Sequence, residues 1–551
     1  MQFMAFNLNT IRFFIATLLL LVGQYTFAKT DIYASNGYYT STVTWEKSKS
    51  PYILHVDVNI EKRGTLIIEP GVEVIGNYKK IKVGGKLYAG YVEGHNNDNP
   101  KNEKVTIKNT YLEAAGIGDR IMNLSHLKMT GGQIYISNRD RPLTQDFILK
   151  NSTLKGSSVK GEYATGNIII TNNIIDQSQI NCTYCGVHLV NNDWWNRPGK
   201  GSLTVSNNDF IGNQSYVRLD QHRFDTIKIN NNTYTSSRGI DVHAHYAVSS
   251  YLGTYSWASS WITPATVEIK NNTFKKDTVG IKVTAGIYDI SGNNFIESPG
   301  IKYEGGTGSN QQGLFSFKIN NNYFIKQGSD GYGIYAIKNV KNSGDDLELK
   351  DNTFCSKDRV ALRLSTDKAA RMEAGDNYWN TTDKTAIQRN MVFDHLVDLD
   401  VKRTISYGVH NQDRNPNLSS ALESACAAES EGSEPEEAEV CTLGGMVLPG
   451  TPALDPASCS VYNIIADVQI PKGVTLRANP GVRIEGKWKK IKVEGGLDFV
   501  GSKDSKIIVN NTYIQPAGDP DDPTYTMNLS HLKMTGGQIY ISNRDRPLTQ
   551  D

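Results

Sequence analysis

The chain has 551 residues, of which 21% are charged and 38% hydrophobic, and its formal net charge is +1. A nearly neutral chain lacks the basic surplus that holds a phosphate backbone, so the composition argues against nucleic acid as a partner. The charge is unevenly placed, because residues 416–440 hold seven glutamates and no lysine or arginine. Since these seven charges are part of the net +1, the rest of the chain carries about +8, which slightly favours acidic partners.

The first 28 residues have the pattern of an export signal. Arg12 precedes an apolar run from Phe13 to Gly23, and the sequence Thr-Phe-Ala then follows in small-x-small order. A run of 11 residues is too short to span a bilayer, so a Sec signal peptide is favoured over a membrane anchor. We therefore predict a secreted protein of the medium or cell surface. No later segment is apolar enough to be transmembrane.

A short motif recurs through the middle of the chain, in which a β-branched strand runs into Asn-x-aromatic. It reads IKINNNTY, VEIKNNTF, YDISGNNF, FKINNNYF, LELKDNTF and MEAGDNYW. The aligned asparagines are Asn208, Asn232, Asn272, Asn293, Asn322, Asn352 and Asn377. Strands this short cannot bury an apolar face alone and must stack on their neighbours. The pattern predicts an all-β fold, a parallel β-helix whose coils are about as long as the shortest spacing, 21 residues.

Stacked coils place equivalent residues about 4.8 Å apart, so side chains of one kind form ladders. The asparagines are predicted to line one buried turn and to hydrogen-bond to the asparagine above and below. The aromatic residues that follow are predicted to stack inside. An exposed Asn or Thr array facing a ligand is the alternative, but ice binding needs a flat, regular Thr row, and the outward rows here are charged and mixed.

Six cysteines in an exported chain allow disulfides without fixing their pairing. Cys182 and Cys185 are close enough to close a loop, and Cys355 is predicted to be a small core residue. Three more lie in or beside the acidic segment, namely Cys426, Cys441 and Cys459. This trio leaves one cysteine over. A four-cysteine zinc site needs a second close pair, which the sequence lacks.

The chain starts again after the acidic segment. EPGVEVIGNYKKIKVGGKL from Glu69 recurs as NPGVRIEGKWKKIKVEGGL from Asn479, and the 25 residues from Met122 recur unchanged from Met527. A large segment is therefore duplicated, and we expect the chain to be a piece of a longer tandem array. The predicted organisation is a signal peptide at 1–28, a β-helix at 29–415, an acidic Cys-containing linker at 416–460 and the start of a second, truncated β-helix at 461–551.

These motifs resemble the pectate-lyase-like right-handed parallel β-helix superfamily, in particular large exported bacterial β-helix repeat proteins. The opening PGV begins at Pro70, and the closing DNYW begins at Asp376 and is followed by a segment expected to be helical. The resemblance covers roughly residues 50–410 and 461–551. It implies the fold and is nearly silent on chemistry, because the superfamily includes lyases, hydrolases, epimerases, adhesins and proteins without known activity.

A second ladder accompanies the asparagine turns, in strands such as GVHLV, YVRLD, GIDVH, GIKVT and GIKYE. Aligning the inward apolar residues places polar side chains of successive coils in adjacent outward rows, about 5 Å apart. The predicted patch is Arg218, Asp220, His222, Asp241, His243, His245, Lys282, Lys302 and Glu304. GVHLV is aligned directly before the strand of Arg218. Because the charges alternate in sign, solvated ion pairs between neighbouring strands are the alternative interpretation.

Two long insertions leave the same end of this predicted sheet. One contains Trp194 and Trp195, and the other contains Tyr255 and Trp257. Flat aromatic faces beside a charged groove suit pyranose rings, so the predicted partner is a polysaccharide or a cell-surface glycan. The alternative is that these aromatic residues fill the core of their own loops. Long loops in a compact solenoid are usually functional.

Two classes of function remain open. We favour an exported carbohydrate-binding or adhesive scaffold, because duplication, an acidic linker and abundant Asn/Gly turns fit a spacer that presents ligand-binding surfaces. The alternative is a lyase or epimerase acting on a uronate polymer, which needs a cation against the substrate carboxylate, a base and an acid. The candidates are Lys282, Lys302 and Arg218 as cations, His243 as base, and Tyr255 or His222 as acid.

No cofactor is expected, with one alternative in which Asp220 and Asp241 hold a Ca²⁺ that bridges to the substrate carboxylate. The same two carboxylates would serve a hydrolase. A metal site built from Asp241, His243 and His245 would spread over about 13 Å along the strand. The Arg-x-Pro-x-x-Arg of pectate lyases, the Gly-His-Gly of polygalacturonases and the Asp-Pro-His-Glu of alginate epimerases are absent, which makes catalysis the second choice.

Overall fold

The structure is a computed structural model of the 551-residue chain. It describes residues 29–90, 103–115, 120–137, 146–164, 166–183, 185, 201–222, 224–244, 266–284, 286–304, 316–325, 332–338, 346–356, 360–365, 372–394, 396, 401, 404–410, 420, 422–424, 426, 440–459, 461–517 and 526–540. The chain divides into two compact units, Met1–Thr233 (unit 1) and Tyr234–Asp551 (unit 2).

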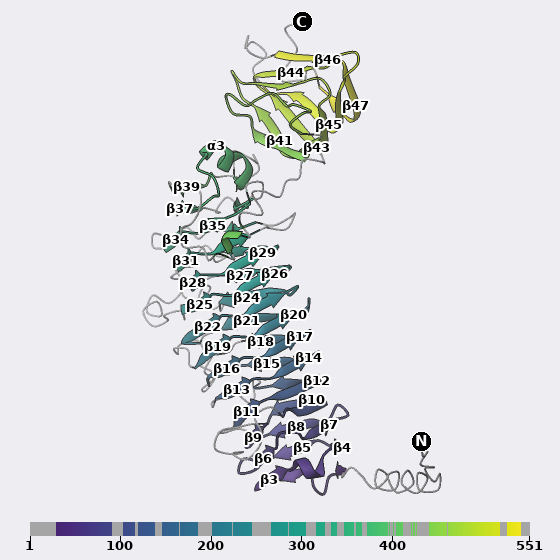
Figure 1. The fold of residues 1–551 in the computed structure, drawn as a ribbon, viewed down its shortest axis with the longest axis vertical. Helices are drawn as coiled ribbons and strands as arrows, with labels where there is room; N and C mark the ends of the chain where they lie inside the picture. The colour runs from purple at the N-terminus through teal and green to yellow at the C-terminus, as the bar shows by residue number, and fades with distance from the viewer. Residues whose placement is uncertain are drawn as a thin grey trace, which may run out of the picture. The chain divides into compact units, whose positions relative to one another are not determined.

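Unit 1 is a stack of short parallel strands (Figure 1). One set consists of β1 (Thr30–Ile32), β2 (Tyr38–Tyr39), β4 (Tyr52–Leu54), β5 (Val58–Ile60), β7 (Glu73–Ile75), β8 (Lys80–Val83), β10 (Val105–Ala114), β12 (Leu127–Tyr135), β14 (Thr153–Lys155), β15 (Ser158–Glu162), β17 (Ile174–Asp176), β18 (Gln179–Thr183), β20 (Asp209–Ile211) and β21 (Tyr216–His222). A second set consists of β3 (Thr42–Trp45), β6 (Thr65–Ile68), β9 (Lys86–Ala89), β11 (Ile121–Ser125), β13 (Phe147–Lys150), β16 (Ile168–Thr171), β19 (Ser202–Ser206) and β22 (Thr226–Asn230). A single 3-10 turn, η1 (Lys47–Lys49), lies near the start, and β23 (Thr233–Thr235) crosses the division between the units.

Unit 2 continues in the same style. Its strands of the first kind are β24 (Gly239–Ala244), β26 (Thr273–Lys275), β27 (Ile281–Thr284), β29 (Asn294–Ile296), β30 (Ile301–Glu304), β32 (Tyr323–Ile325), β33 (Ile334–Lys338), β35 (Thr353–Phe354), β36 (Leu362–Leu364) and β38 (Val392–Phe393). Those of the second kind are β25 (Thr266–Lys270), β28 (Ile287–Ser291), β31 (Ser316–Asn320) and β34 (Asp346–Lys350). The pair β37 (Glu373–Asn377) and β39 (Ser406–Val409) follows, with a helical turn α3 (Lys384–Ala386) that runs into a π-helix at Ile387–Met391.

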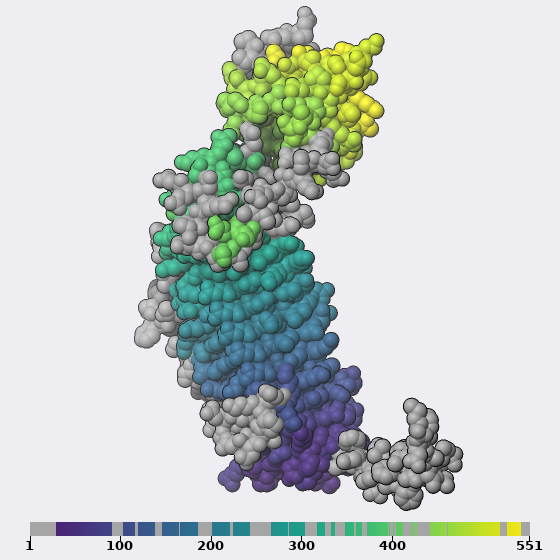
Figure 2. All heavy atoms as spheres, viewed as in Figure 1, coloured from purple at the N-terminus to yellow at the C-terminus, as the bar shows by residue number. Residues whose placement is uncertain are grey.

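Each strand is paired in parallel with the strand one coil away and buries every second residue. In β15 and β18, for example, Val159 lies opposite Ile180, and both are buried, whereas the outward neighbours Lys160 and Asn181 are half-buried. Figure 2 shows the coils as successive ridges of side chains within each unit. The all-β, parallel β-helix predicted from the repeats is therefore confirmed.

The predicted asparagine ladder is present in both units. In unit 1, Nδ2 of Asn173 donates to Oδ1 of Asn208 at 2.9 Å, and Nδ2 of Asn208 donates to Oδ1 of Asn232 at 3.0 Å. In unit 2 the same bond links consecutive members of a run that consists of Asn272, Asn293, Asn322, Asn352 and Asn377. These side chains are at most 2% exposed. Each carbonyl oxygen also accepts the backbone N–H of the asparagine one coil below, as between Asn322 and Asn352.

The left-handed residue of this turn precedes the buried asparagine. Asn207 has φ +55°, Asn231 +57°, Asn271 +55° and Asn321 +55°. A second asparagine at that place is favoured because its short side chain tolerates the left-handed region. The Asn-Asn pair in the repeat thus has two roles, one conformational and one in the ladder.

The predicted aromatic stack also exists. Within unit 2 the rings of Tyr234, Phe274, Phe295 and Phe324 follow one another with centroids 4.8 to 4.9 Å apart. Phe354 and Trp379 continue the stack at spacings of 5.0 Å. The ring spacing matches the distance between coils, so this core column and the asparagine ladder fix the same register.

All six cysteines lie in the described part of the chain and form Cys182–Cys185, Cys355–Cys426 and Cys441–Cys459. The first pair closes the predicted loop. Cys355 is buried, as predicted, and within the trio Cys441 and Cys459 pair and leave Cys426 over. The sequence did not reveal that Cys426, which packs beside Ile325, bonds to Cys355 across 71 residues of sequence. Separation along the chain concealed that neighbourhood.

A second solenoid begins at β40 (Val440–Met446), inside the segment predicted to be a linker. Its other strands are β41 (Val461–Ile470), β42 (Thr475–Ala478), β43 (Arg483–Val493), β44 (Gly496–Val500), β45 (Ile507–Pro516), β46 (Thr526–Ser530) and β47 (Leu532–Ile539). They enclose a separate apolar core that includes Ile464, Ile491, Leu497 and Ile514. The predicted domain limits otherwise stay predictions. Among the described residues, no helix combines the length and the apolarity that crossing a membrane requires.

The asparagine ladder generates a first prediction. Replacing Asn322 by alanine removes the acceptor of the Asn293 backbone N–H, one acceptor of the Asn293 side-chain amide, and the side-chain donor to the Ile290 carbonyl. The Asn293 amide keeps the Ile269 carbonyl. Each buried unpaired polar group costs about 1–3 kcal/mol. We expect Asn322→Ala to lower the thermal midpoint followed by circular dichroism by an amount that reflects about 3 kcal/mol or more. The exposed Lys318→Ala, on β31, is the control and should change it little; equal midpoints for both variants would contradict a structural role for the ladder.

A serine row beside the asparagines generates a second prediction. Ser237 donates its backbone N–H to Oδ1 of Asp277 at 2.6 Å, and the backbone N–H of Asp277 donates to Oγ of Ser298 at 3.0 Å. Burial raises the pKa of Asp277 to about 6 against the opposing hydrogen bonds from Ser237. The folded state binds the proton of the Asp277 carboxyl group more tightly than the unfolded state does. The contribution of this proton to stability is therefore complete below the pKa of the unfolded state, and it is lost as the pH rises through about 6.

Asp277→Asn keeps an acceptor for Ser237 and removes the buried charge. We expect the variant to be more stable than the wild type by up to about 3 kcal/mol near neutral pH, and equally stable at about pH 4. Thermal unfolding at the two pH values measures this. If the difference in stability between the variant and the wild type is the same at both pH values, Asp277 does not titrate as its burial indicates.

Candidate functional site

The predicted patch is described in part. His245, Trp194, Trp195, Tyr255 and Trp257 lie outside the described residues. For three further candidates, His222, His243 and Glu304, the described part is the backbone, and their side chains lie outside it. Their proposed roles in binding or catalysis stay predictions.

In unit 2 the register agrees with the alignment made from sequence. Asp241 lies opposite Lys282, and Lys282 opposite Lys302. The row continues to Tyr335 and Arg363, where Nζ of Lys302 is 5.4 Å and the Arg363 guanidinium carbon 5.1 Å from the centroid of the Tyr335 ring. In the next row His243 lies opposite Thr284 and Thr284 opposite Glu304. Residues far apart in sequence thus share one outward face.

In unit 1 the register differs from the prediction. Arg218 lies opposite Asn181, and Asp220 opposite Thr183, so β18 is the strand next to β21. The prediction that GVHLV, at residues 186–190, is the strand next to β21 is therefore wrong. β18, with the sequence QINCT, has the same alternation and buries Ile180 and Cys182. Nη2 of Arg218 lies 3.6 Å from Oδ2 of Asp220. The expected neighbourhood of Asp220 and Asp241 spans the two units and stays a prediction.

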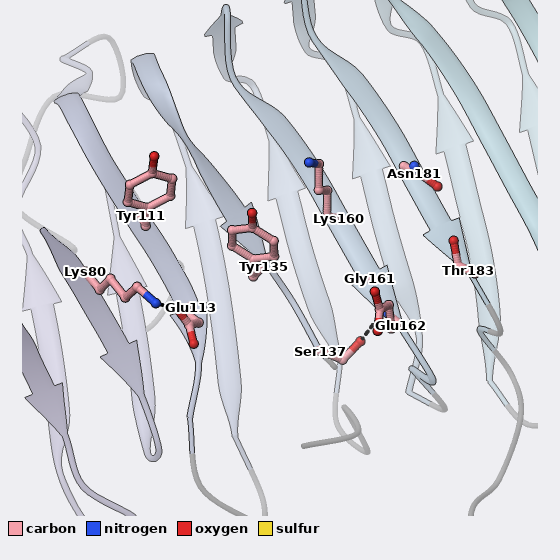
Figure 3. A pocket seen from close by; sticks show the side chains of 10 residues that line it. All are labelled: Lys80, Tyr111, Glu113, Tyr135, Ser137, Lys160, Gly161, Glu162, Asn181 and Thr183. Carbon is pink, nitrogen blue, oxygen red and sulfur yellow. Dashed lines mark hydrogen bonds and ion pairs between the residues drawn. The ribbon is translucent and has the colours of Figure 1, made fainter. Parts of the chain in front are cut away.

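The described part of unit 1 contains a hollow of about 480 Å³ that the sequence interpretation missed (Figure 3). It lies over the outward face of β8, β10, β12, β15 and β18, close to β21 in the register. Its lining consists of Lys80, Tyr111, Glu113, Tyr135, Ser137, Lys160, Gly161, Glu162, Asn181 and Thr183. Arg218 and Asp220 therefore continue the same outward rows by one coil.

Parallel pairing arranges these side chains in rows. Tyr111 lies opposite Lys80, Glu113 opposite Tyr135, and Lys160 opposite both Tyr135 and Asn181. With Arg218 opposite Asn181 this makes a continuous stripe across six strands. We call it the tyrosine–lysine face, defined by Lys80, Tyr111, Glu113, Tyr135, Lys160, Asn181 and Arg218. In Figure 3 the two tyrosine rings stand side by side on adjacent strands.

Two of the three cations on this face have a carboxylate partner, because Lys80 pairs with Glu113 and Arg218 with Asp220. Nζ of Lys80 lies 2.7 Å from Oε2 of Glu113, which is the main reason that the pKa of Lys80 is raised. Nζ of Lys82, on the same strand, lies 2.9 Å from Oδ2 of Asp57. Lys160 is different, because its ammonium nitrogen lies 5.8 Å from the centroid of the Tyr135 ring. A cation held beside an aromatic face is available to an anionic group that meets the same ring.

Tyr135 is half-buried, and burial raises the pKa of its phenol above the ordinary value. The neighbouring Tyr111 and Glu113 add to the increase, and Lys80 opposes it. Tyr135 is therefore a neutral hydrogen-bond donor at physiological pH. A phenolate that abstracts a proton is disfavoured there.

The face also offers acceptors. The side-chain oxygens of Gln133, Gln179 and Asn181 are buried and have no hydrogen-bond donor in the part of the chain that the structure describes. Gln133 lies opposite Tyr111, and Gln179 precedes Asn181 on β18 by one outward position. A ligand hydroxyl group would reach these solvent-shielded oxygens only after the amide groups turn outward.

A signal for this site was present in the sequence. Lys80 belongs to the YKKIK segment, which recurs as WKKIK, and Tyr135 belongs to the 25 residues that occur twice unchanged. The duplication indicates the domain organisation, and it also repeats residues of the outward face. The aromatic residues of the two long insertions instead favoured a site on β21 and the strands after it.

No group of three or more His, Cys, Asp or Glu side chains suited to a metal ion occurs among the described residues. The Ca²⁺ alternative with Asp220 and Asp241 depends on the neighbourhood across the two units and stays a prediction. On the tyrosine–lysine face, Glu113 is already engaged by Lys80.

Comparison with known proteins gives a limited result. No protein-family model matches the chain, and no curated protein matches it. Among solved structures, a PL6-family alginate lyase, AlyGC, matches at 11% identity with a TM-score of 0.22, over 93% of this chain and 76% of that one. An arginine-to-alanine mutant of that enzyme matches at 10% identity with a TM-score of 0.24, over 93% and 80% of the two chains. Similarity at this level says nothing about the chemistry of this protein.

Proposed function

We propose that the protein is an exported β-helix protein that binds acidic polysaccharide along the tyrosine–lysine face of unit 1. The observation that carries the proposal is the continuous stripe of aromatic, cationic and amide side chains across parallel strands. A linear polymer presents repeating rings and hydroxyl groups, and a ladder of coils presents repeating side chains about 4.8 Å apart.

The chemistry of each component suits a uronate chain. Tyr111 and Tyr135 provide flat rings for stacking on pyranose faces. Lys160 provides positive charge for the carboxylates, and Arg218, which is paired with Asp220, is a second cation one coil further. Asn181 provides an amide group for a hydroxyl group. A site that combines a few placed polar groups with aromatic walls is the usual form of a small-molecule or glycan site.

Export is part of the proposal and is supported by the cysteines. Three disulfides in one chain are typical of proteins that mature in an oxidising compartment. This agrees with the signal peptide predicted at residues 1–28, which lie outside the described part of the chain. The protein would therefore meet its polysaccharide in the medium or on a cell surface.

Binding without turnover is the function that the tyrosine–lysine face supports best. A lyase or epimerase needs a base for the C5 proton, and the raised pKa of Tyr135 disfavours that role. Neutral Tyr135 and ion-paired Glu113 are suited to hold a chain in place. Activity centred on His243 and Lys282 in unit 2 is the alternative function, which the assay below detects.

The proposal predicts that Tyr111→Ala together with Tyr135→Ala weakens binding of alginate or pectate oligomers at this face by about tenfold or more, because both stacking surfaces are lost. Isothermal titration calorimetry of the full chain measures the affinity. Binding should also weaken as NaCl is raised, since surface charges contribute. Tyr323→Ala, which removes a partly buried tyrosine from β32 of unit 2, is the matched control and should leave the affinity unchanged.

The same samples distinguish the alternative. New ultraviolet absorbance from an unsaturated uronate during incubation would identify a lyase, and its loss in His243→Ala and Lys282→Ala would place it in unit 2. No binding and no turnover with any acidic polysaccharide would contradict the proposed function.

A further inference from the structure

The second solenoid reproduces the core of the tyrosine–lysine face. Lys490 lies opposite Tyr513, and Tyr513 opposite Gln538, as Lys80, Tyr111 and Gln133 do in unit 1. Lys492 lies opposite Gln515. Tyr540 follows Ile539 directly and donates its backbone N–H to the Ile514 carbonyl, so it occupies the position that Tyr135 has in the first copy.

The backbone that presents these residues is also the same in both copies. Asn109 and Asn511 have φ values of +48° and +49°. The next residue is a threonine, fully buried in each copy, whose hydroxyl donates to the carbonyl two residues earlier at 2.9 Å in Thr110 and 2.8 Å in Thr512. The turn thus aims Tyr111 and Tyr513 in the same way.

A close approach of the preceding coil makes this turn specific. A Cβ atom built on Gly76 would meet Oγ1 of Thr110 at 2.1 Å, and one built on Gly486 would meet Oγ1 of Thr512 at 2.0 Å. Glycine is therefore required in both copies where the coil before the tyrosine passes over the threonine. The duplication has kept the whole local geometry as well as the side chains.

The second copy keeps aromatic residues at three equivalent positions. Trp488 takes the place of Tyr78 and is 58% exposed. Its ring centroid lies 6.1 Å from that of Tyr513, and the Tyr513 and Tyr540 centroids are 6.5 Å apart. Three rings therefore follow one another on β43, on β45 and directly after β47, with Trp488 and Tyr540 exposed and Tyr513 partly exposed.

The two copies differ in charge at one decisive position. Asp467 pairs with Lys492 at 3.1 Å, as Asp57 pairs with Lys82. Glu113, however, which neutralises Lys80, is replaced by Gln515. Lys490 is exposed, and Asp467 accepts its backbone N–H at 2.9 Å. Among the described residues, no carboxylate forms an ion pair with its ammonium group, because Asp467 is paired with Lys492. The second copy therefore offers a cation beside its aromatic rings where the first copy has an ion pair.

We propose that the second solenoid holds a second glycan site, formed by Trp488, Tyr513, Tyr540 and Lys490, that is selective for carboxylated sugars over neutral ones. The inference rests on the proposed function for the class of ligand, and it adds a site and a source of charge selectivity. An anionic ring stacked on Tyr513 places its carboxylate against Lys490 without first breaking a salt bridge.

Two sites on one chain have a functional consequence. A long polymer that occupies one site is held at a high effective concentration near the other when the chain geometry permits both contacts. A weak preference for carboxylate at each site then becomes a strong preference for the polymer. Short oligomers, which occupy one site at a time, lack this gain and report each site separately.

The experiment is calorimetric titration of the full chain with short alginate or pectate oligomers and with a neutral oligosaccharide of equal length. We expect two acidic oligomers per wild-type chain. Trp488→Ala with Tyr513→Ala should reduce this to one, as should Tyr111→Ala with Tyr135→Ala, and all four substitutions together should abolish binding. Retained thermal midpoints show that the variants are folded.

A charge exchange gives a second test that leaves the aromatic residues in place. Gln515→Glu restores the ion pair of the first copy and should weaken acidic oligomers at the second site about fivefold, without changing a neutral one. Glu113→Gln should strengthen the first site by a similar factor. The two substitutions exchange the residues of equivalent positions in the two copies, so each serves as the control for the other.

The outcomes separate the two proposals. One site per chain that Trp488→Ala with Tyr513→Ala does not affect would overturn the second site and leave the proposed function intact. One site that these substitutions abolish, and that Tyr111→Ala with Tyr135→Ala does not affect, would overturn binding at the tyrosine–lysine face and leave the second site intact. Two sites with no response to Gln515→Glu would overturn the charge selectivity, and a wild-type chain that binds no acidic oligomer would overturn both proposals.

Discussion

The register between successive coils is the constraint on which the rest of the structure depends. Buried asparagines bond to one another from coil to coil, with Nδ2 of Asn208 at 3.0 Å from Oδ1 of Asn232 in unit 1 and the same distance between Asn272 and Asn293 in unit 2. Each carbonyl oxygen also accepts a backbone N–H, so a slip of one residue would leave buried polar groups unpaired in every coil. The outward rows of these coils inherit that alignment, and Ser152 extends it to the strand of Tyr135 by donating its backbone N–H to Asn173 and accepting that of Leu127.

The fold followed from the sequence because its repeated unit is local. An Asn-x-aromatic turn behind a β-branched strand is recognisable within ten residues, and its stacking partner is a copy of itself. The register within unit 2 was predictable for the same reason, since Asp241, Lys282 and Lys302 occupy equivalent places in similar strands. In unit 1 two segments, QINCT and GVHLV, alternated equally well, and pattern alone selected the wrong one. The Cys355–Cys426 disulfide joins residues that no repeat relates, so spacing did not reveal it.

The tyrosine–lysine face was harder to foresee, because its members do not belong to the asparagine repeat. Tyr111 lies in a long strand, β10, that pairs with both β7 and β8. Aromatic residues in long loops were the more visible signal. The duplication contained the missing information, since a binding surface copied with its turn, its glycine and its buried threonine is repeated as a unit.

Side-chain protection measures the central claim most directly. Hydroxyl-radical footprinting of the full chain, read by mass spectrometry with and without an acidic oligosaccharide, reports the solvent access of individual tyrosines. A ligand bound along the stacked coils should protect Tyr111 and Tyr135 and leave Tyr323 unchanged. Protection confined to Tyr323 or to other residues outside the tyrosine–lysine face, with Tyr111 and Tyr135 oxidised as fast as in the free protein, would contradict the account.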